Sequence, residues 1–186
     1  MERAHETMHG GHHPAADQWA RRIAVLISAL AATLALTELG AKSSQNAYLT
    51  HHIAVSDQWA FYQAKNLRGV VRDSEATLLE SLPNASDPAI QARVQAARDY
   101  SARMRDDPKG GEGMKQMAVK ARTEEAERDE AFHRYHGYEY AAGALEISIV
   151  LASVAVVTRI MAFAVTAGGI GAVAAAAGLA VALHIL

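Results

Sequence analysis

Three long apolar runs are separated by polar sequence along this chain. The first covers residues 23–39, and the other two lie within residues 140–186, divided by Arg159. Each run is close to the ~20 apolar residues that a helix needs to cross a bilayer. Charged residues concentrate between the first and second runs and become rare after residue 140. This pattern predicts an all-α integral membrane protein with three transmembrane helices and a polar insertion after the first.

The same pattern divides the chain into five segments. They are a flexible His-rich tail (residues 1–20), transmembrane helix 1 (residues 21–41), an extramembrane helical arm (residues 42–139), transmembrane helix 2 (residues 140–158) and transmembrane helix 3 (residues 159–186). The tail contains His5, His9, His12 and His13. A His-rich tract can bind divalent metal, but this polar composition is also typical of a disordered tail.

Proline and glycine divide the arm into helical pieces that predict a hairpin. One long helix is expected over residues 43–82, and it stops at Pro83. Asp87 and Pro88 form a helix cap followed by a proline, so a shorter helix is expected to follow them. The Gly-rich residues 107–113 predict a loop before a second long, highly charged helix.

The first arm helix has apolar residues spaced by three, four and seven, which predicts a coiled-coil-like interaction seam. Bulky aromatic residues lie beside this pattern near its middle. We expect the seam to be buried against a partner. It consists of Ile53, Trp59, Tyr62, Leu67, Val71 and Leu78.

The last apolar run contains small residues at spacings that let membrane helices approach closely. Gly171, Ala175 and Gly178 are the residues that we expect to form this packing face. The alternative is that such residues face lipid. Close packing is favoured because glycine inside a helix needs compensation.

Arginine positions predict the orientation of the chain. Arg21 and Arg22 precede the first span, and Arg159 lies between the second and third. Two crossings return the chain to the same side, so the positive-inside rule places all three in the cytoplasm. The arm is then extracytoplasmic, and periplasmic in a Gram-negative cell.

The decapeptide Ser56–Lys65 (SDQWAFYQAK) and the passage from Phe132 to Thr158 carry a family resemblance. They resemble the bacterial domain-of-unknown-function family 4337. The resemblance implies a His-rich head, an early span, a charged helical middle and a C-terminal membrane hairpin. It therefore implies a multi-pass protein of the bacterial inner membrane, and it implies no activity.

Composition and motifs argue against several functions. The net charge of −2 predicts no nucleic-acid partner, and the absence of cysteine excludes thiol chemistry. No catalytic triad, phosphate loop or dinucleotide fingerprint stands out, so we predict no enzyme activity and no cofactor.

Ionisable residues supply two further hypotheses. Glu38 and Glu146 lie inside apolar runs, where a charge is expensive, and we expect Glu146 to be buried against protein. Together they suggest a proton or cation conduit, although Glu38 can also reach the interface and a protonated Glu146 can also pack. His51, His52, His133 and His136 can meet in an arm hairpin, but solvated helices often carry such histidines, so no metal is predicted.

We therefore expect a structural or interaction membrane protein. Its partners are the lipid bilayer and either further copies of itself, as a homo-oligomer, or a larger membrane complex of which it is a subunit. The arm and the membrane helices form the contacts. The alternatives are an oligomeric proton or cation conduit and a periplasmic metal-sensing protein.

Overall fold

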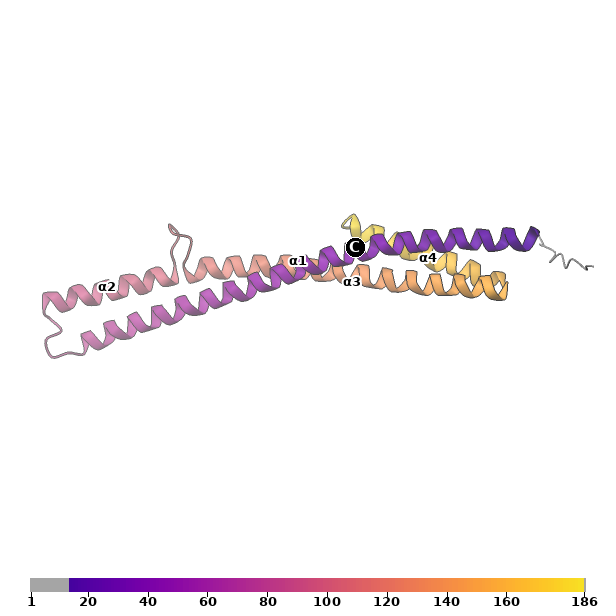
Figure 1. The fold of residues 1–186 in the computed structure, drawn as a ribbon. Helices are drawn as coiled ribbons and strands as arrows, with labels where there is room; N and C mark the ends of the chain where they lie inside the picture. Colours follow the sequence, from indigo (N-terminus) through magenta and orange to yellow (C-terminus); the bar gives the residue numbers. More distant parts are fainter. Residues whose placement is uncertain (1–13, 186) are drawn as a thin grey trace, which may run out of the picture. The chain divides into compact units, whose positions relative to one another are not determined.

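The structure is a computed structural model that describes residues 14–185, and over this range it contains helices and no strand (Figure 1). The predicted all-α class is confirmed. The four predicted tail histidines lie outside the described residues. In chain order the helices are α1 (Pro14–Glu80), α2 (Pro88–Arg105), α3 (Met114–Thr158) and α4 (Met161–Ala182).

The helix ends follow the predicted local chemistry. Asp87 caps α2, where its side chain accepts a 2.8 Å hydrogen bond from the Ala89 amide, and Pro88 occupies the first turn. In the loop before α3, the Gly110 amide donates a 2.9 Å hydrogen bond to Asp107 Oδ1. Gly111 adopts a φ of 70°, a left-handed conformation that glycine accepts without a steric penalty.

The chain divides into two compact units, which we describe separately. Among the described residues, the apolar unit comprises residues 14–43 and 134–185, and the charged unit comprises residues 44–133. Both α1 and α3 contribute to each unit. The charged unit lies within the arm predicted at residues 42–139.

In the apolar unit, α1 and α3 run antiparallel. Ile23 near the start of α1 packs with Ala155 near the end of α3, and Leu30 packs with Leu145. Helix α4 runs parallel to α1, because Ala167 packs in the cluster of Ile23 and Ala174, further along α4, packs in the cluster of Leu30. The result is a three-helix arrangement in which each helix reverses the direction of the one before it.

Very short side chains let these helices approach. Gly171 of α4 is buried, and a Cβ atom placed there would overlap the Leu30 side chain of α1 and lie 3.6 Å from Ser148 Cβ of α3. Gly178 is also buried, and its Cβ would lie 3.5 Å from Thr37 Oγ1. Glycine at these two positions therefore brings three helices together.

The reversal between α3 and α4 takes only two residues, Arg159 and Ile160. Arg159 has a φ of 58°, which is uncommon for a residue with a side chain. Its amide donates a 2.9 Å hydrogen bond to the Ala155 carbonyl, and the Ile160 amide donates one of 3.4 Å to Thr158 Oγ1. These bonds satisfy backbone groups at the end of α3.

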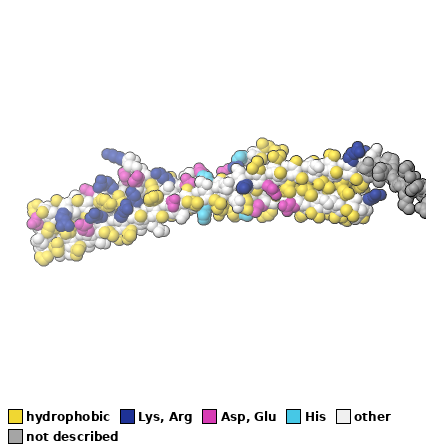
Figure 2. Space-filling view, viewed as in Figure 1, with side chains coloured by type: hydrophobic (Ala, Val, Ile, Leu, Met, Phe, Trp, Pro, Cys, Tyr) yellow, Lys and Arg dark blue, Asp and Glu magenta, His cyan; other side chains and the backbone are white. Residues whose placement is uncertain are grey.

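Three helices, α1, α3 and α4, are long and apolar enough to cross a membrane, with best windows of mean hydropathy 2.0, 2.0 and 1.8. Only 17%, 28% and 33% of those windows is buried inside the protein, so most of their apolar surface faces outward. Hydrophobic side chains accordingly cover much of the visible surface of the apolar unit in Figure 2. Length and composition thus support three candidate spans.

In the charged unit, α1 runs antiparallel to α2 and to the first part of α3. Ala76 of α1 is buried with Val94 and Ala97 of α2. Further along, Arg98 of α2 forms a 2.7 Å ion pair with Glu80 of α1. Figure 2 shows acidic and basic side chains intermixed over this unit. A small apolar core with ion pairs at its edges therefore holds these helices.

Candidate functional site

Two apolar faces lie on opposite sides of α1 in the charged unit. The covered face includes Val55 and Ala76, which are 7% and 1% exposed. The opposite face is a row of large side chains that no other part of the described chain covers. We call it the α1 stripe, and its members are Leu49 (47% exposed), Ile53 (61%), Leu67 (65%), Val71 (56%) and Leu78 (66%).

The structure separates the predicted seam into two groups. Ile53, Leu67, Val71 and Leu78 belong to the α1 stripe, so the chain itself does not bury them, and their burial against a partner stays a prediction.

Trp59 and Tyr62 are half-buried outside the stripe. The Trp59 indole Nε1 donates a 2.9 Å hydrogen bond to Glu125 of α3, and its ring contacts Tyr62 edge-on at 5.4 Å. Helices α2 and α3 pack on the face of α1 that carries smaller side chains, such as Gly69 and Ala76. The larger side chains of the α1 stripe stay exposed.

The two predicted membrane carboxylates are both exposed on the surface of the apolar unit. The expected burial of Glu146 against protein is therefore wrong within one chain. Its neighbour Leu145 packs at the level of Leu30, and Glu38 lies eight residues beyond Leu30, about 12 Å along α1. Within the described residues, neither carboxylate has a hydrogen-bonding or ion-pairing partner.

The predicted packing face of α4 lies against the other two helices. Gly171 and Gly178 are buried in it, as described above, whereas Ala175 is half-buried beside the buried Ala174. Gly168 and Gly169 lie in the same helix with nothing within 4 Å of an added Cβ. The contact face of α4 is therefore defined by direction around the helix as well as by residue size.

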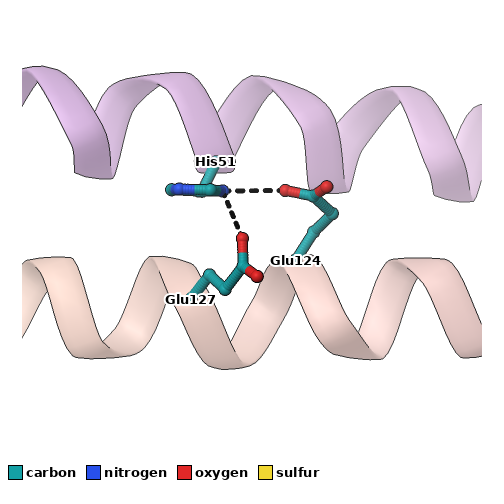
Figure 3. A group of neighbouring side chains, drawn as sticks. All are labelled: His51, Glu124 and Glu127. Carbon is teal, nitrogen blue, oxygen red and sulfur yellow. Dashed lines mark hydrogen bonds and ion pairs between the residues drawn. The ribbon is translucent and has the colours of Figure 1, made fainter.

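Three ionisable side chains converge between α1 and α3 in the charged unit (Figure 3). His51 of α1 points at Glu124 and Glu127, which are three residues apart and thus on one face of α3. His51 Nδ1 lies 2.8 Å from Glu124 Oε2 and 3.2 Å from Glu127 Oε2. We call this group the His51 cluster.

Two further contacts join α1 and α3 next to the His51 cluster. The Trp59 indole of α1 is hydrogen-bonded to Glu125, which lies between Glu124 and Glu127 in the sequence of α3. The Tyr48 ring of α1 packs on the Phe132 ring of α3, with centroids 5.4 Å apart. The cluster thus lies where other side chains already join the two helices.

The other predicted histidines do not join this cluster. The His52 ring contacts Tyr48 at 5.6 Å, and the His133 ring contacts Phe132 at 6.2 Å. His136 belongs to the apolar unit, where its Nδ1 lies 2.8 Å from Glu139. Sequence reasoning found His51 but missed its glutamate partners. The available signal was the Glu-x-x-Glu spacing on the charged helix.

Exposed side chains elsewhere have shifted pKa values with evident causes. A hydrogen bond from Gln116, and then one from Lys115, lowers the pKa of Asp106 at the end of α2. A hydrogen bond from Arg72 lowers the pKa of Glu75. These groups stabilise helix ends and edges, and they line no enclosed site.

The fold defines a class: an all-helical protein with three candidate membrane spans and a charged helical unit. The chain belongs to the family described as domain of unknown function (DUF4337), whose profile matches residues 19–184. This confirms the resemblance carried by Ser56–Lys65. No curated protein and no solved structure matches the chain.

Proposed function

We propose that this chain is a non-enzymatic structural protein of the bacterial inner membrane that assembles with further copies of itself. Three spans anchor it, and the charged unit forms an extramembrane arm. The α1 stripe is the observation that carries the proposal. Large aliphatic side chains at coiled-coil spacing are rarely left in water along a whole helix.

A second copy suits the stripe better than an unrelated partner, because the stripe is a self-matching heptad pattern. Copies anchored in one membrane with one orientation are related by an axis along the membrane normal. Their α1 helices then run parallel, and each stripe residue meets its own counterpart. Leu67 faces Leu67 of the second copy, and Val71 faces Val71.

The size of the stripe is adequate for a weak pairing that the spans reinforce. From Leu49 to Leu78 it runs for roughly 45 Å of helix, and a contact about 10 Å wide covers on the order of 450 Å² per chain. Two such faces approach the ~1,000 Å² at which specific interfaces begin. Contacts between membrane helices would add to this area.

Glu146 supports assembly inside the membrane as well. It is exposed on α3 within an apolar stretch, and a carboxylate facing lipid near the bilayer centre costs about 2.5–3.5 kcal/mol on insertion scales. A neighbouring copy that covers this side chain would remove the exposure to lipid. The same position thus favours a protein neighbour over bare lipid.

The arginines supply the orientation. Arg21 and Arg22 adjoin Ile23, which packs with Ala155, so Arg159 lies at the same end of the apolar unit. We place this end in the cytoplasm and residues 44–133 in the periplasm. Ser86→Cys should then react with an impermeant thiol reagent in spheroplasts, and Thr158→Cys should not. The opposite labelling would reverse the orientation.

The assembly is tested by cross-linking a single cysteine to itself. The chain has no native cysteine, so Val71→Cys alone should give a disulfide-linked dimer in isolated membranes. Asn66→Cys is the matched control, because it is exposed on the same helix about 140° away from Val71. The mass of the protein in detergent, measured by light scattering, should exceed that of one chain.

Two outcomes would overturn the proposal. The first is a monomeric mass with no dimer from Val71→Cys. The second is equal cross-linking from Val71→Cys and Asn66→Cys, which indicates random collision. If the protein is a dimer by these measurements, a triple variant should abolish it, because a charged seam cannot pair. The three substitutions are Leu67→Asp, Val71→Asp and Leu78→Asp.

A conduit is the second candidate, and Glu146 is the observation that favours it. Glu146→Gln keeps the shape and removes the charge, so it distinguishes the two roles. A structural protein should keep its mass in detergent with this change. A conduit should lose pH-driven proton flux in proteoliposomes, and Glu38→Gln should reduce the flux if both carboxylates lie on one path. Absence of flux in the unaltered protein would exclude the conduit.

A further inference from the structure

We propose that the His51 cluster is a binding site for one divalent transition-metal ion, with Zn²⁺ as the representative, which links α1 to α3. Its ligand atoms are His51 Nδ1 and one carboxylate oxygen each from Glu124 and Glu127. The proposal does not depend on self-assembly, because all three ligands come from one chain.

The donor set selects the class of ion. Imidazole nitrogen binds zinc, iron, nickel and copper well, whereas a site made only of oxygen atoms suits magnesium or calcium. One nitrogen and two carboxylates supply three protein ligands, the number found in open zinc sites, where water takes the fourth position. The absence of cysteine leaves a nitrogen and oxygen site as the way this chain can bind such an ion.

The distances fit an ion of this size. The three ligand atoms all lie within 4.8 Å of one another, with His51 Nδ1 at 2.8 and 3.2 Å from the two oxygens. Tetrahedral zinc with bonds of about 2.0–2.2 Å separates its ligand atoms by about 3.4 Å. A bound ion would therefore lengthen the two distances from His51 Nδ1 by well under about 1 Å. The Glu127 side chain is 52% exposed, which gives the ion a route from water.

Charge supplies the second argument. Two carboxylates converge on one imidazole, and within the described residues no lysine or arginine pairs with Glu124 or Glu127. A neutral imidazole carries no charge, and its Nδ1 has only one proton to donate. Even a protonated His51 offsets only one of the two negative charges. A divalent ion neutralises both carboxylates while His51 Nδ1 gives up its proton and binds through its lone pair.

The surrounding structure holds the ligands in place before any ion arrives. The Trp59–Glu125 hydrogen bond and the Tyr48–Phe132 contact join α1 and α3 next to the cluster. Ligands placed on two rigid helices lose little freedom on binding. The cluster therefore has the features of a built site and not only of two exposed glutamates near a histidine.

The test is a titration of the full chain in detergent with Zn²⁺, in which the binding is measured by isothermal calorimetry. The protein should be purified without a polyhistidine tag. Because the N-terminal tail is His-rich, the titration uses a background in which His5, His9, His12 and His13 are all changed to Gln. In this background we expect one Zn²⁺ ion per chain.

Three variants locate the ion. His51→Ala should abolish binding, and Glu124→Gln and Glu127→Gln should each weaken it by at least about tenfold. His52→Ala is the matched control, because it removes a neighbouring histidine that contacts Tyr48 instead of the glutamates, and it should bind normally. Helix content measured by circular dichroism should be the same in all variants.

A second measurement reports the link between the helices. Zn²⁺ should slow amide hydrogen exchange around His51 and around Glu124, and this protection should disappear in Glu127→Gln. The proposal is overturned if the tail-substituted background binds no Zn²⁺. It is also overturned if His51→Ala and Glu127→Gln bind as the background does, or if binding gives no protection at either helix. If His51→Ala fails to fold, the two glutamine variants decide.

Discussion

The apolar unit and the charged unit are both built from antiparallel helices, yet different contacts hold them. In the apolar unit, buried glycines such as Gly171 bring backbones together, and the Thr37 hydroxyl donates a 2.9 Å hydrogen bond back to its own helix at Thr33. In the charged unit, ion pairs such as Arg98–Glu80 join one helix to another.

This difference reflects the surroundings for which each unit is suited. Apolar helices in lipid gain little from hiding apolar surface, so close fit decides how they pair. In water, a small buried core supplies most of the stability, and exposed ion pairs add little. Added volume should therefore be most damaging in the apolar unit, and lost methyl groups in the charged unit.

The largest effect should come from Gly171→Leu. Its side chain would occupy the space of Leu30, and overpacking of this kind costs about 1–3 kcal/mol or more. Unfolding in mixed detergent micelles, followed by circular dichroism, should show it. Gly168→Leu is the control, since nothing lies within 4 Å of an added Cβ there. Equal losses in both variants would mean that close fit does not set the packing.

A smaller effect is expected for Val94→Ala in the charged unit. Val94 is 5% exposed, and removing two buried methyl-sized groups costs about 1.5 kcal/mol. Hydrogen exchange of residues 88–105 should report the loss locally. Val119→Ala removes the same atoms at a site that is 65% exposed, and should change stability by less than about 0.5 kcal/mol. A comparable loss at Val119 would contradict the assigned core.

Removing an ion pair should matter less again. Arg98→Ala deletes the bond to Glu80, which raises the pKa of Arg98, and the two side chains of this pair are 53% and 40% exposed. The variant should unfold in urea slightly more easily at low salt. The difference should vanish at ~1 M salt, where the screening length falls to about 3 Å. A difference that survives high salt would give this pair a larger role than its exposure indicates.

The smallest effect should appear at Asp106, and only as a change with pH. Hydrogen bonds from Gln116 and Lys115 lower its folded-state pKa below the ordinary 3.8. The contribution to stability is therefore present above pH 3.8 and is lost as the pH falls through the lower folded-state value. Asp106→Asn should remove that dependence, and thermal unfolding at pH 3 and pH 7 would reveal it. An unchanged pH profile would refute the assignment.

Much of the fold was predictable because the strongest signals are local. Apolar runs gave the candidate spans, and Pro83, Pro88 and the glycines near residue 110 marked where helices end. The covered face of α1 was not predictable in the same way. It is lined by small residues such as Gly69 and Ala76, whose short side chains give a weak hydrophobic signal, so the larger α1 stripe dominated the pattern.

The His51 cluster shows a different limit. His51 was recognised as a candidate, but its partners depend on the pairing of α1 with α3. That pairing depends on the two loops at residues 81–87 and 106–113. The spacing of apolar residues along the helices does not predict the geometry of these loops. The aromatic contact of Tyr48 with Phe132 fixes it in the structure. A shift of one helical turn would place a different residue against His51.

The two-residue turn at Arg159 bears on how the protein is made. Only Arg159 and Ile160 separate α3 from α4. A turn this short does not let one helix insert into the membrane while the other stays in water. We expect the pair to leave the insertion machinery together, with the guanidinium retained on the side where synthesis occurs. A chain released after Thr158 would expose α3 without the glycine face that fits it, and cellular quality control should remove it.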